Sequence, residues 1–244
     1  MKLHVLGCGD AFGNGGRNQS GYLLDAGDRL FLLDCGPTTL LAMKRAGFDP
    51  ARLDVVCLSH LHGDHFGGLP FFFISYLYEN PRDQPLHIAG PAGTEERVVE
   101  LFRLMYGSDS PSRELPPTRF HTLLPDRAET IKGLHVFPFR VPHQVRTTSL
   151  GLKISYQGKQ ILFSGDSAWT NLFLSHAPGV DLFLCECSFY AQETDNHLSY
   201  RTLQRHAAQL QCKRLVLTHL GVEMLAHRHE LGMTCAEDGM VIEL

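Results

Sequence analysis

The run His-Leu-His-Gly-Asp-His at positions 60–65 constrains this chain more than any other feature of its sequence. It brings three imidazoles and one carboxylate together within six positions. Zinc, iron and manganese accept both ligand types. Because alternate residues of an extended segment share a face, His60, His62 and Asp64 can converge on one side, whereas His65 must reach a site from a turn. One segment that points in two directions predicts two metal positions.

Three later segments each read as a strand that ends in another ligand-type residue. They end in His143, in Asp166 after a glycine that permits a tight turn, and in His219. Taken alone, either histidine could be an ordinary structural residue. Together with residues 60–65, the set has five histidines and two aspartates. With one bridging carboxylate it supplies about eight bonds, enough for two four-coordinate metals with a water or hydroxide completing the site.

The remaining pattern predicts an α/β fold. Many strands with few helices favour sheets that are covered by helices, a layered sandwich. No repeat or linker divides residues 1–244, so we expect a single domain. Residues 107–117, with three prolines, are predicted to form an exposed loop or lid. The predicted strands cover residues 2–6, 22–24, 29–34, 55–59, 86–89, 134–141, 149–156, 160–164, 182–186 and 215–218, and the predicted helices cover 38–46, 93–105 and 200–210.

Charge and cysteine content favour a cytoplasmic protein that is not built to grip nucleic acid. The net charge of -4 lacks the basic excess with which proteins meet phosphate backbones. Seven cysteines without a C-x-x-C pair, and no secretory signal before the first strand, fit buried thiols in a reducing compartment. Cys185 and Cys187 could form a soft metal pair, but alternation on a buried strand explains them more simply.

The most apolar run, residues 69–78, is too short to cross a bilayer, which needs about 20 residues. We therefore expect no membrane association, and we interpret the run as a buried helix or a wall beside the site. Its part over residues 71–78 could instead form the surface of a homodimer. The sequence leaves the oligomeric state open.

The order of the ligand-type motifs resembles that of the metallo-β-lactamase superfamily. The run over 60–65 is followed by His143, by Ser-Gly-Asp ending at Asp166, and by Leu-Thr-His ending at His219. The resemblance implies a four-layer αβ/βα sandwich with a dinuclear site, commonly zinc, at one edge of the two sheets. It also implies that Asp166 bridges two metals, of which one is held by His60, His62 and His143 and the other by Asp64, His65 and His219. Manganese or iron would suit the same ligands.

Two segments near the N-terminus resemble the ribonuclease Z-like phosphodiesterases of that superfamily. Leu-Gly-x-Gly at 6–9, followed by Arg-Asn-x-Ser at 17–20, implies a turn that binds an anion, with Arg17 and Ser20 as substrate-binding residues. A glycine turn with a surface arginine would give the same pattern. Asp-Cys-Gly at 34–36 implies that Asp34 lies behind a histidine ligand and orients it.

A third segment of the ribonuclease Z type follows the predicted strand 182–186. Its members are Glu186 and the sequence His197-Leu-Ser199. The resemblance implies that the glutamate supports the histidine and that the histidine donates a hydrogen bond or proton to the scissile phosphate or to its leaving oxygen. A carboxylate partner raises the proton affinity of an imidazole, which suits that task. Alternatively, Ser199 is a helix N-cap and His197 is a bystander.

These features together predict a metal-dependent hydrolase that uses a hydroxide activated by two metals. Phosphodiesters are the expected substrates, either small or cyclic ones or RNA ends, with Asp64, His197 and Glu186 as catalytic residues. Only 22 residues separate His143 from Asp166, which leaves no room for the tRNA-gripping arm of bacterial ribonuclease Z, so small or cyclic diesters are favoured over RNA. Hydrolysis of a carboxyl ester, a thioester or a lactam, and a metal-binding module without turnover, remain the alternatives.

Overall fold

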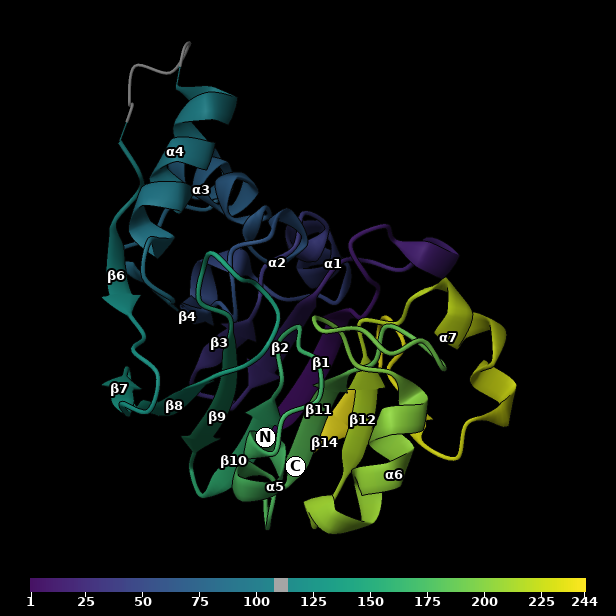
Figure 1. Ribbon diagram of the computed structural model, residues 1–244. Helices are drawn as coiled ribbons and strands as arrows, with labels where there is room; N and C mark the ends of the chain where they lie inside the picture. The colour runs from purple at the N-terminus through teal and green to yellow at the C-terminus, as the bar shows by residue number, and fades with distance from the viewer. Residues whose placement is uncertain (108–113) are drawn as a thin grey trace.

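Two sheets that face each other form the centre of the molecule (Figure 1). The computed structural model describes residues 1–107 and 114–244, and within these residues each sheet has seven strands. The first sheet runs, in spatial order, through β14 (Val241–Glu243), β1 (Lys2–Gly7), β2 (Gly21–Asp25), β3 (Leu30–Leu33), β4 (Leu53–Cys57), β5 (Leu86–Gly90) and β6 (Thr118–Thr122). The second runs through β13 (Thr234–Cys235), β12 (Leu215–Thr218), β11 (Leu182–Glu186), β10 (Lys159–Phe163), β9 (Leu150–Tyr156), β8 (Leu134–Arg140) and β7 (Glu129–Ile131).

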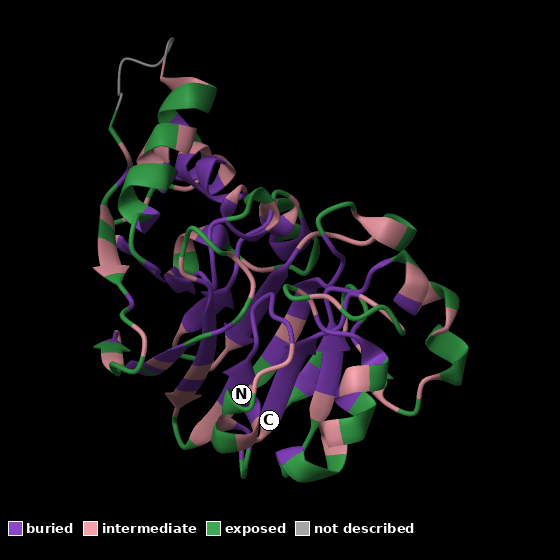
Figure 2. Ribbon diagram, in the orientation of Figure 1, coloured by how far each residue is buried: buried purple, intermediate pink, exposed green. Residues whose placement is uncertain are grey.

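Helices cover the outer face of each sheet. One apolar core lies between the sheets, and a further core separates each sheet from its helices. Figure 2 shows the strands mostly buried and the outer sides of the helices exposed. The first sheet carries α1 (Thr39–Arg45), α2 (Gly63–Phe66), α3 (Leu69–Tyr78) and α4 (Thr94–Tyr106), and the second carries α5 (Leu172–His176), α6 (Tyr200–Leu210) and α7 (Val222–Ala226). This is the α/β sandwich that the sequence predicts.

Strand β4 illustrates why the sequence folds in this way. Val55 and Cys57 pack in the core between the sheets, whereas Val56 and Leu58 pack against the helices. A strand that is buried on both faces reads as a continuous apolar run rather than an alternating one. The run ends where the chain leaves the core, and residues 60–65 begin there.

Strand direction brings the ligand-type residues to one edge. In the second sheet, β8 and β10 are both antiparallel to β9, and β10, β11 and β12 are parallel to one another. The carboxyl ends of β8, β10, β11 and β12 therefore point the same way. His143, Asp166, Glu186 and His219 all stand at or just beyond these ends, facing the segment that follows β4. The two sheets thus assemble the site from opposite sides.

Most of the predicted strands and helices are confirmed, with boundaries shifted by one or two residues. The strands that the sequence analysis did not predict, β6, β7, β13 and β14, are short or lie at sheet edges. Edge strands need few buried side chains, so they carry little apolar pattern. Cys185 and Cys187 are buried together in the core beneath α6, as the strand interpretation predicts.

The apolar run over 69–78 forms α3, and most of its side chains are buried within the chain. No helix in the described ranges is long and apolar enough to span a membrane. Of the predicted loop or lid over 107–117, residues 108–113 lie outside the described residues. The predicted turn at His65 is a short helix instead, because α2 begins at Gly63 and carries His65 in its last turn.

Candidate metal centre

The seven ligand-type residues gather at one end of the sandwich in two groups that share Asp166. In each group the candidate ligand atoms lie within 4.8 Å of one another. The three-histidine group consists of His60, His62, His143 and Asp166, and the two-aspartate group consists of Asp64, His65, Asp166 and His219. This is the division that the sequence resemblance implies, although the residues come from both sheets.

Three imidazole nitrogens converge in the three-histidine group. Nδ1 of His62 lies 3.0 Å from Nε2 of His60 and 3.1 Å from Nε2 of His143. Burial lowers the pKa of all three imidazoles, and that of His60 lies well below its ordinary value. Neutral imidazole is the form that binds a metal. Three neutral imidazole nitrogens that converge at one point cannot all find a hydrogen-bond partner in one another. A divalent cation at that point would accept the lone pairs of all three, so these ligand atoms fit a metal.

Carboxylates and protons dominate the two-aspartate group. Nε2 of His65 lies 3.1 Å from Asp64 and 3.3 Å from Asp166, and Nε2 of His219 lies 3.4 Å from Asp64 and 3.3 Å from Asp166. Burial alone would lower the pKa of His219, but the charge of Asp166 and the hydrogen bond to Asp64 outweigh it and raise the pKa to about 9. The pKa of His65 is raised in the same way. A bound cation would replace these protons as the partner of the two carboxylates.

Asp34 stands directly behind the two-aspartate group. It is fully buried at the end of β3, and its carboxylate accepts a 2.7 Å hydrogen bond from Nδ1 of His65. The backbone N–H and the hydroxyl of Ser59 donate to the same carboxylate, at 2.8 and 2.9 Å. Because Asp34 holds Nδ1 of His65, the Nε2 atom of the same ring faces the carboxylates of the two-aspartate group. This contact is the one that the Asp-Cys-Gly segment implies.

The turns that deliver the ligands are conformationally demanding. Gly165, just before Asp166, has φ 58°, and a Cβ there would meet the carbonyl oxygen of Leu150 and the Cβ of Ser59 at 2.7 Å each. His219 itself has φ 54°, a left-handed conformation that is uncommon for a side chain of this size. Strained backbone of this kind concentrates at functional sites.

Glu186 and His197 form a pair beside the cluster. Glu186 is buried at the end of β11, and its Oε1 lies 2.8 Å from Nδ1 of His197. Burial acts to lower the pKa of His197, but the hydrogen bond and charge of Glu186 prevail and raise it. The ring stacks on that of His219 at 5.7 Å and meets that of His143 edge-on at 4.8 Å. Ser199 caps α6, so the N-cap interpretation is correct, yet His197 still lines the site.

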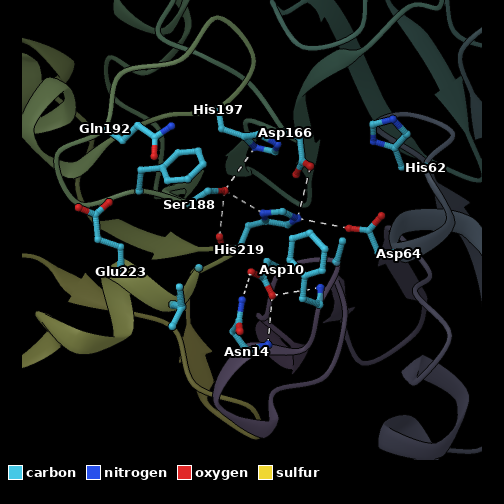
Figure 3. A pocket seen from close by; sticks show the side chains of 15 residues that line it. Asp10, Asn14, His62, Asp64, Asp166, Ser188, Gln192, His197, His219 and Glu223 are labelled. Atoms are coloured by element: carbon cyan, nitrogen blue, oxygen red, sulfur yellow. Dashed lines mark hydrogen bonds and ion pairs between the residues drawn. The ribbon is translucent and has the colours of Figure 1, made fainter.

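A cavity of about 490 Å³ opens in front of the cluster (Figure 3). Its inner wall is formed by His197 and by several of the seven candidate ligands, which together are called the cluster. Its outer wall is formed by the glycine-rich loop over residues 10–16 and by the start of α7. Asp10 fixes that loop, because its carboxylate accepts hydrogen bonds from the backbone of Phe12 and Asn14, at 3.2 and 3.1 Å. Phe12, which is 86% exposed, and Phe189 both line this cavity. The two aromatic side chains offer an apolar surface to a ligand.

Sequence reasoning missed several residues of this cavity. Ser188, two positions after Glu186, lies with its hydroxyl 3.0 Å from Nδ1 of His219 and is a strand-end residue that could have been recognised. Asp10, directly after the Gly-x-Gly turn, offered a similar signal. Phe12 and Phe189 offered none, because an isolated phenylalanine in a loop reads as a core residue.

The structure places Arg17 and Ser20, the predicted substrate-binding residues, away from the cavity in front of the candidate ligands. Nη1 of Arg17 lies 2.9 Å from the carbonyl oxygen of Ala236 and 3.0 Å from Sγ of Cys8. Ser20 is 1% exposed, and neither residue lines the cavity. The glycines serve close packing, since a Cβ at Gly7 or Gly9 would collide with residues 17–19. In this structure the segment fastens a loop to the C-terminal strands.

Comparison with known proteins now identifies the family. The profile of the family described as anti-Pycsar protein Apyc1 matches residues 1–240. The chain belongs to this family. The probable metallo-hydrolase YhfI of Bacillus subtilis is 28% identical over 229 residues, which cover 90% of this chain and 87% of that protein. The uncharacterized protein Rv1339 of Mycobacterium tuberculosis is 31% identical over 226 residues, covering 90% and 81%.

Solved structures of similar fold include both a family relative and a ribonuclease. The crystal structure of the metallo-β-lactamase fold protein YhfI matches with a TM-score of 0.79 and 25% identity, over 99% of this chain and 98% of the other. The short form of human tRNase Z matches with a TM-score of 0.80 and 24% identity, over 100% and 99%. The predicted membership in the metallo-β-lactamase superfamily, near ribonuclease Z, is confirmed.

Proposed function

We propose that this member of the Apyc1 family is a metal-dependent phosphodiesterase that acts on small or cyclic phosphodiesters. The observation that carries the proposal is the Glu186–His197 pair beside the cluster. Hydrolysis of a phosphodiester expels an alkoxide, which is a strong base, so a proton donor placed beside the candidate metal ligands assists its departure.

The two groups would hold two divalent metals, most suitably zinc, with manganese or iron as alternatives. When bound, such metals supply Lewis-acid stabilisation of phosphoryl oxygens and lower the pKa of water. Asp166 lies between the two groups and suits the bridging position. The chain's own residues complete the site around them.

His197 is the proposed acid. Because Glu186 holds Nδ1, the Nε2 atom is free to donate to the leaving oxygen or to the phosphate, and the raised pKa means that the ring holds its proton more tightly than an ordinary histidine. Glu186 is itself fixed by the backbone N–H groups of Ser167 and Ser188, at 2.7 and 3.1 Å. The hydrogen bonds of Asp64 to His219 and His65 lower its pKa despite burial, so it is a weak base that serves chiefly to hold a metal and orient the attacking water.

The cavity supports a small substrate. Its volume of about 490 Å³ lies in the range of small-molecule sites, roughly 300–1,000 Å³. The aromatic side chains of Phe12 and Phe189 would contact a planar or apolar group, as in a cyclic nucleotide. Between His143 and Asp166 the chain forms β9, a tight turn at Gln157 and β10, so this segment is a hairpin without a projecting arm.

The proposal is tested by offering metal-replete protein phosphodiesters, carboxyl esters, thioesters and a lactam side by side. We expect hydrolysis of 3′,5′-cyclic nucleotides and of bis(4-nitrophenyl) phosphate. Cleavage confined to the carbon esters, thioesters or lactam would overturn the proposal. Stoichiometric metal binding with no hydrolysis at all would favour a metal-binding module.

The role of His197 has its own test. His197→Ala should lower phosphodiester turnover by about a hundredfold, the usual contribution of a positioned acid, and should leave metal content unchanged. Metal content is measured by elemental mass spectrometry on the same preparations. His229→Ala, at an exposed histidine, is the matched control. Equal loss of metal and of activity in His197→Ala would show that this residue is a ligand, a reading that its proximity to Glu186 and His219 permits.

A further inference from the structure

A second cavity, of about 440 Å³, lies against His197. It is enclosed by the loop between β11 and α6, by the first turns of α6, and by the loop that follows Asp166. Within the described residues, His197 alone lines both this cavity and the one in front of the cluster. His197 therefore borders two spaces, one lined by candidate metal ligands and one whose lining includes none of them.

The walls of the second cavity are preformed. Thr194 Oγ1 accepts a 3.0 Å hydrogen bond from the backbone N–H of His197 and donates to its carbonyl oxygen at 3.1 Å, which fixes the loop. Trp169 is held from behind by His206, whose ring stacks on the indole at 4.1 Å with 9° between the planes. An indole that is positioned in this way offers an apolar contact surface without a large ordering cost.

Two acidic side chains and one arginine line this cavity beside His197, whose own charge is offset by the buried Glu186. Glu193 and Arg205 form an ion pair at 2.6 Å and offset each other. Asp195 is exposed at the cavity and has no ion-pair partner among the described residues. A carboxylate without a counter-charge repels an anion and attracts a cation. The cavity is therefore suited to an uncharged or cationic group and is unfavourable for a second phosphate.

We propose that this second cavity is a subsite for the leaving alcohol of linear phosphodiesters, with a preference for uncharged or cationic alcohols. The inference rests on the proposed phosphodiesterase function. In an in-line displacement the entering and leaving oxygens lie on opposite sides of phosphorus. With the water on the side of the cluster and the leaving oxygen at His197, the departing group extends past the imidazole into the second cavity. A cyclic diester has no separate leaving group and uses the first cavity alone.

The reaction is ordinary hydrolysis. A water oxygen forms a new bond to phosphorus, and the bond from phosphorus to the leaving oxygen breaks. His197 gives its Nε2 proton to that oxygen, so the group departs as a neutral alcohol. The proton that the water loses passes to solvent, and His197 regains a proton from solvent. The products are a phosphomonoester in the first cavity and an alcohol in the second.

The test uses the zinc-loaded enzyme and diesters of adenosine 5′-phosphate that differ only in the alcohol. Choline, its uncharged isostere 3,3-dimethylbutanol and the anionic 3-hydroxypropanoate are compared, with 3′,5′-cyclic AMP as the substrate that bypasses the subsite. We expect kcat/KM for the choline and dimethylbutyl esters to exceed that for the anionic ester, with AMP as the product. Asp195→Lys should shift the ratio of kcat/KM for the choline ester to kcat/KM for the anionic ester by roughly tenfold in favour of the anionic ester. The same substitution should change the rate of cyclic AMP hydrolysis by less than about twofold.

The apolar wall is tested at Trp169. Trp169→Ala should raise KM for the dimethylbutyl ester by roughly tenfold, in line with the loss of one apolar contact surface, and Trp169→Phe should restore most of the affinity. Circular dichroism and unchanged cyclic AMP hydrolysis would show that both variants fold. Equal effects on linear and cyclic substrates, no effect on either, or hydrolysis of cyclic AMP alone by the wild type would overturn the subsite while leaving the phosphodiesterase function intact. Failure to cleave any diester would overturn that function and the subsite with it.

Discussion

The three-histidine group and the two-aspartate group differ in what stands behind their imidazoles. In the first, His60 meets the hydroxyl of Ser59 at 3.0 Å and His143 meets the backbone carbonyl of Asn196 at 2.7 Å, so both partners are uncharged. In the second, His65 lies between the buried carboxylate of Asp34 on one side and two aspartates on the other. The same ligand type is therefore held in two electrostatic settings.

The difference decides how each group would receive a metal. Burial lowers the pKa of His60, and the imidazoles of the three-histidine group are neutral and ready to bind. Carboxylates raise the pKa of His65 and His219, so a metal must first displace protons from the two-aspartate group. We expect the first group to depend on imidazole geometry and the second on its charges.

The largest expected effect comes from the residue that both groups share. Asp166→Ala removes a candidate ligand from each, so both metals should be lost or weakened and phosphodiester turnover should fall by roughly a thousandfold, about 4 kcal/mol in activation free energy. Metal content by elemental mass spectrometry and kcat on a cyclic nucleotide are the measurements. Retention of one tightly bound metal would show that Asp166 belongs to a single group.

A smaller effect separates the two groups. Asp34→Asn keeps the size of the side chain, and asparagine tolerates the left-handed backbone at this position, where φ is 55°. Loss of the carboxylate behind His65 should weaken metal binding to the two-aspartate group by roughly 10- to 100-fold and affect the three-histidine group less, because Asp34 reaches His60 only through the hydroxyl of Ser59. Competition with a chromophoric chelator measures both affinities. Asp83→Asn, on the surface, is the control, and equal weakening of both metals would contradict the comparison.

The last expected effect is a difference in the pH dependence of metal affinity. The pKa of His219 is raised to about 9, so in the metal-free protein this imidazole is protonated at pH 7. Its proton competes with metal, and affinity of the two-aspartate group should therefore rise with pH up to about 9, by roughly tenfold per unit for each displaced proton. The lowered pKa values of the three-histidine group predict a nearly flat affinity from pH 7 to 9. Titration calorimetry of His62→Ala and His219→Ala isolates the two groups, and equal slopes would refute the distinction.

Much of the site could be predicted because its information is local. Residues 60–65 lie in one unbroken segment, and each later ligand follows a recognisable apolar strand. The residue type and its place at a strand end therefore both mark these residues as candidate ligands. Asp34, Glu186 and His197 were found through short motifs whose residues do meet in space, as the 2.7 and 2.8 Å contacts show.

Other features could not be predicted from the sequence, because they depend on which segments the fold brings into contact. A Gly-x-Gly turn can serve anion binding or close packing, and only the structure shows that residues 17–19 pack against those glycines. The second cavity has no motif at all, since Trp169 and Asp195 come from separate loops that meet only once α6 is packed. The short edge strands are not predicted for a related reason. Their formation depends on the strands with which they pair rather than on an apolar pattern in their own side chains.

The placement of the cluster on the seam between the two sheets has a thermodynamic consequence. Residues 60–65 leave the first sheet, whereas His143, Asp166 and His219 leave the second, so an ion held by both would fasten the two layers to each other. Because the unfolded chain cannot present these ligands together, each ion at a thousandfold excess over its dissociation constant would add about 4 kcal/mol to the free energy of unfolding. The supply of metal would then govern how long the folded protein survives, quite apart from how fast it works.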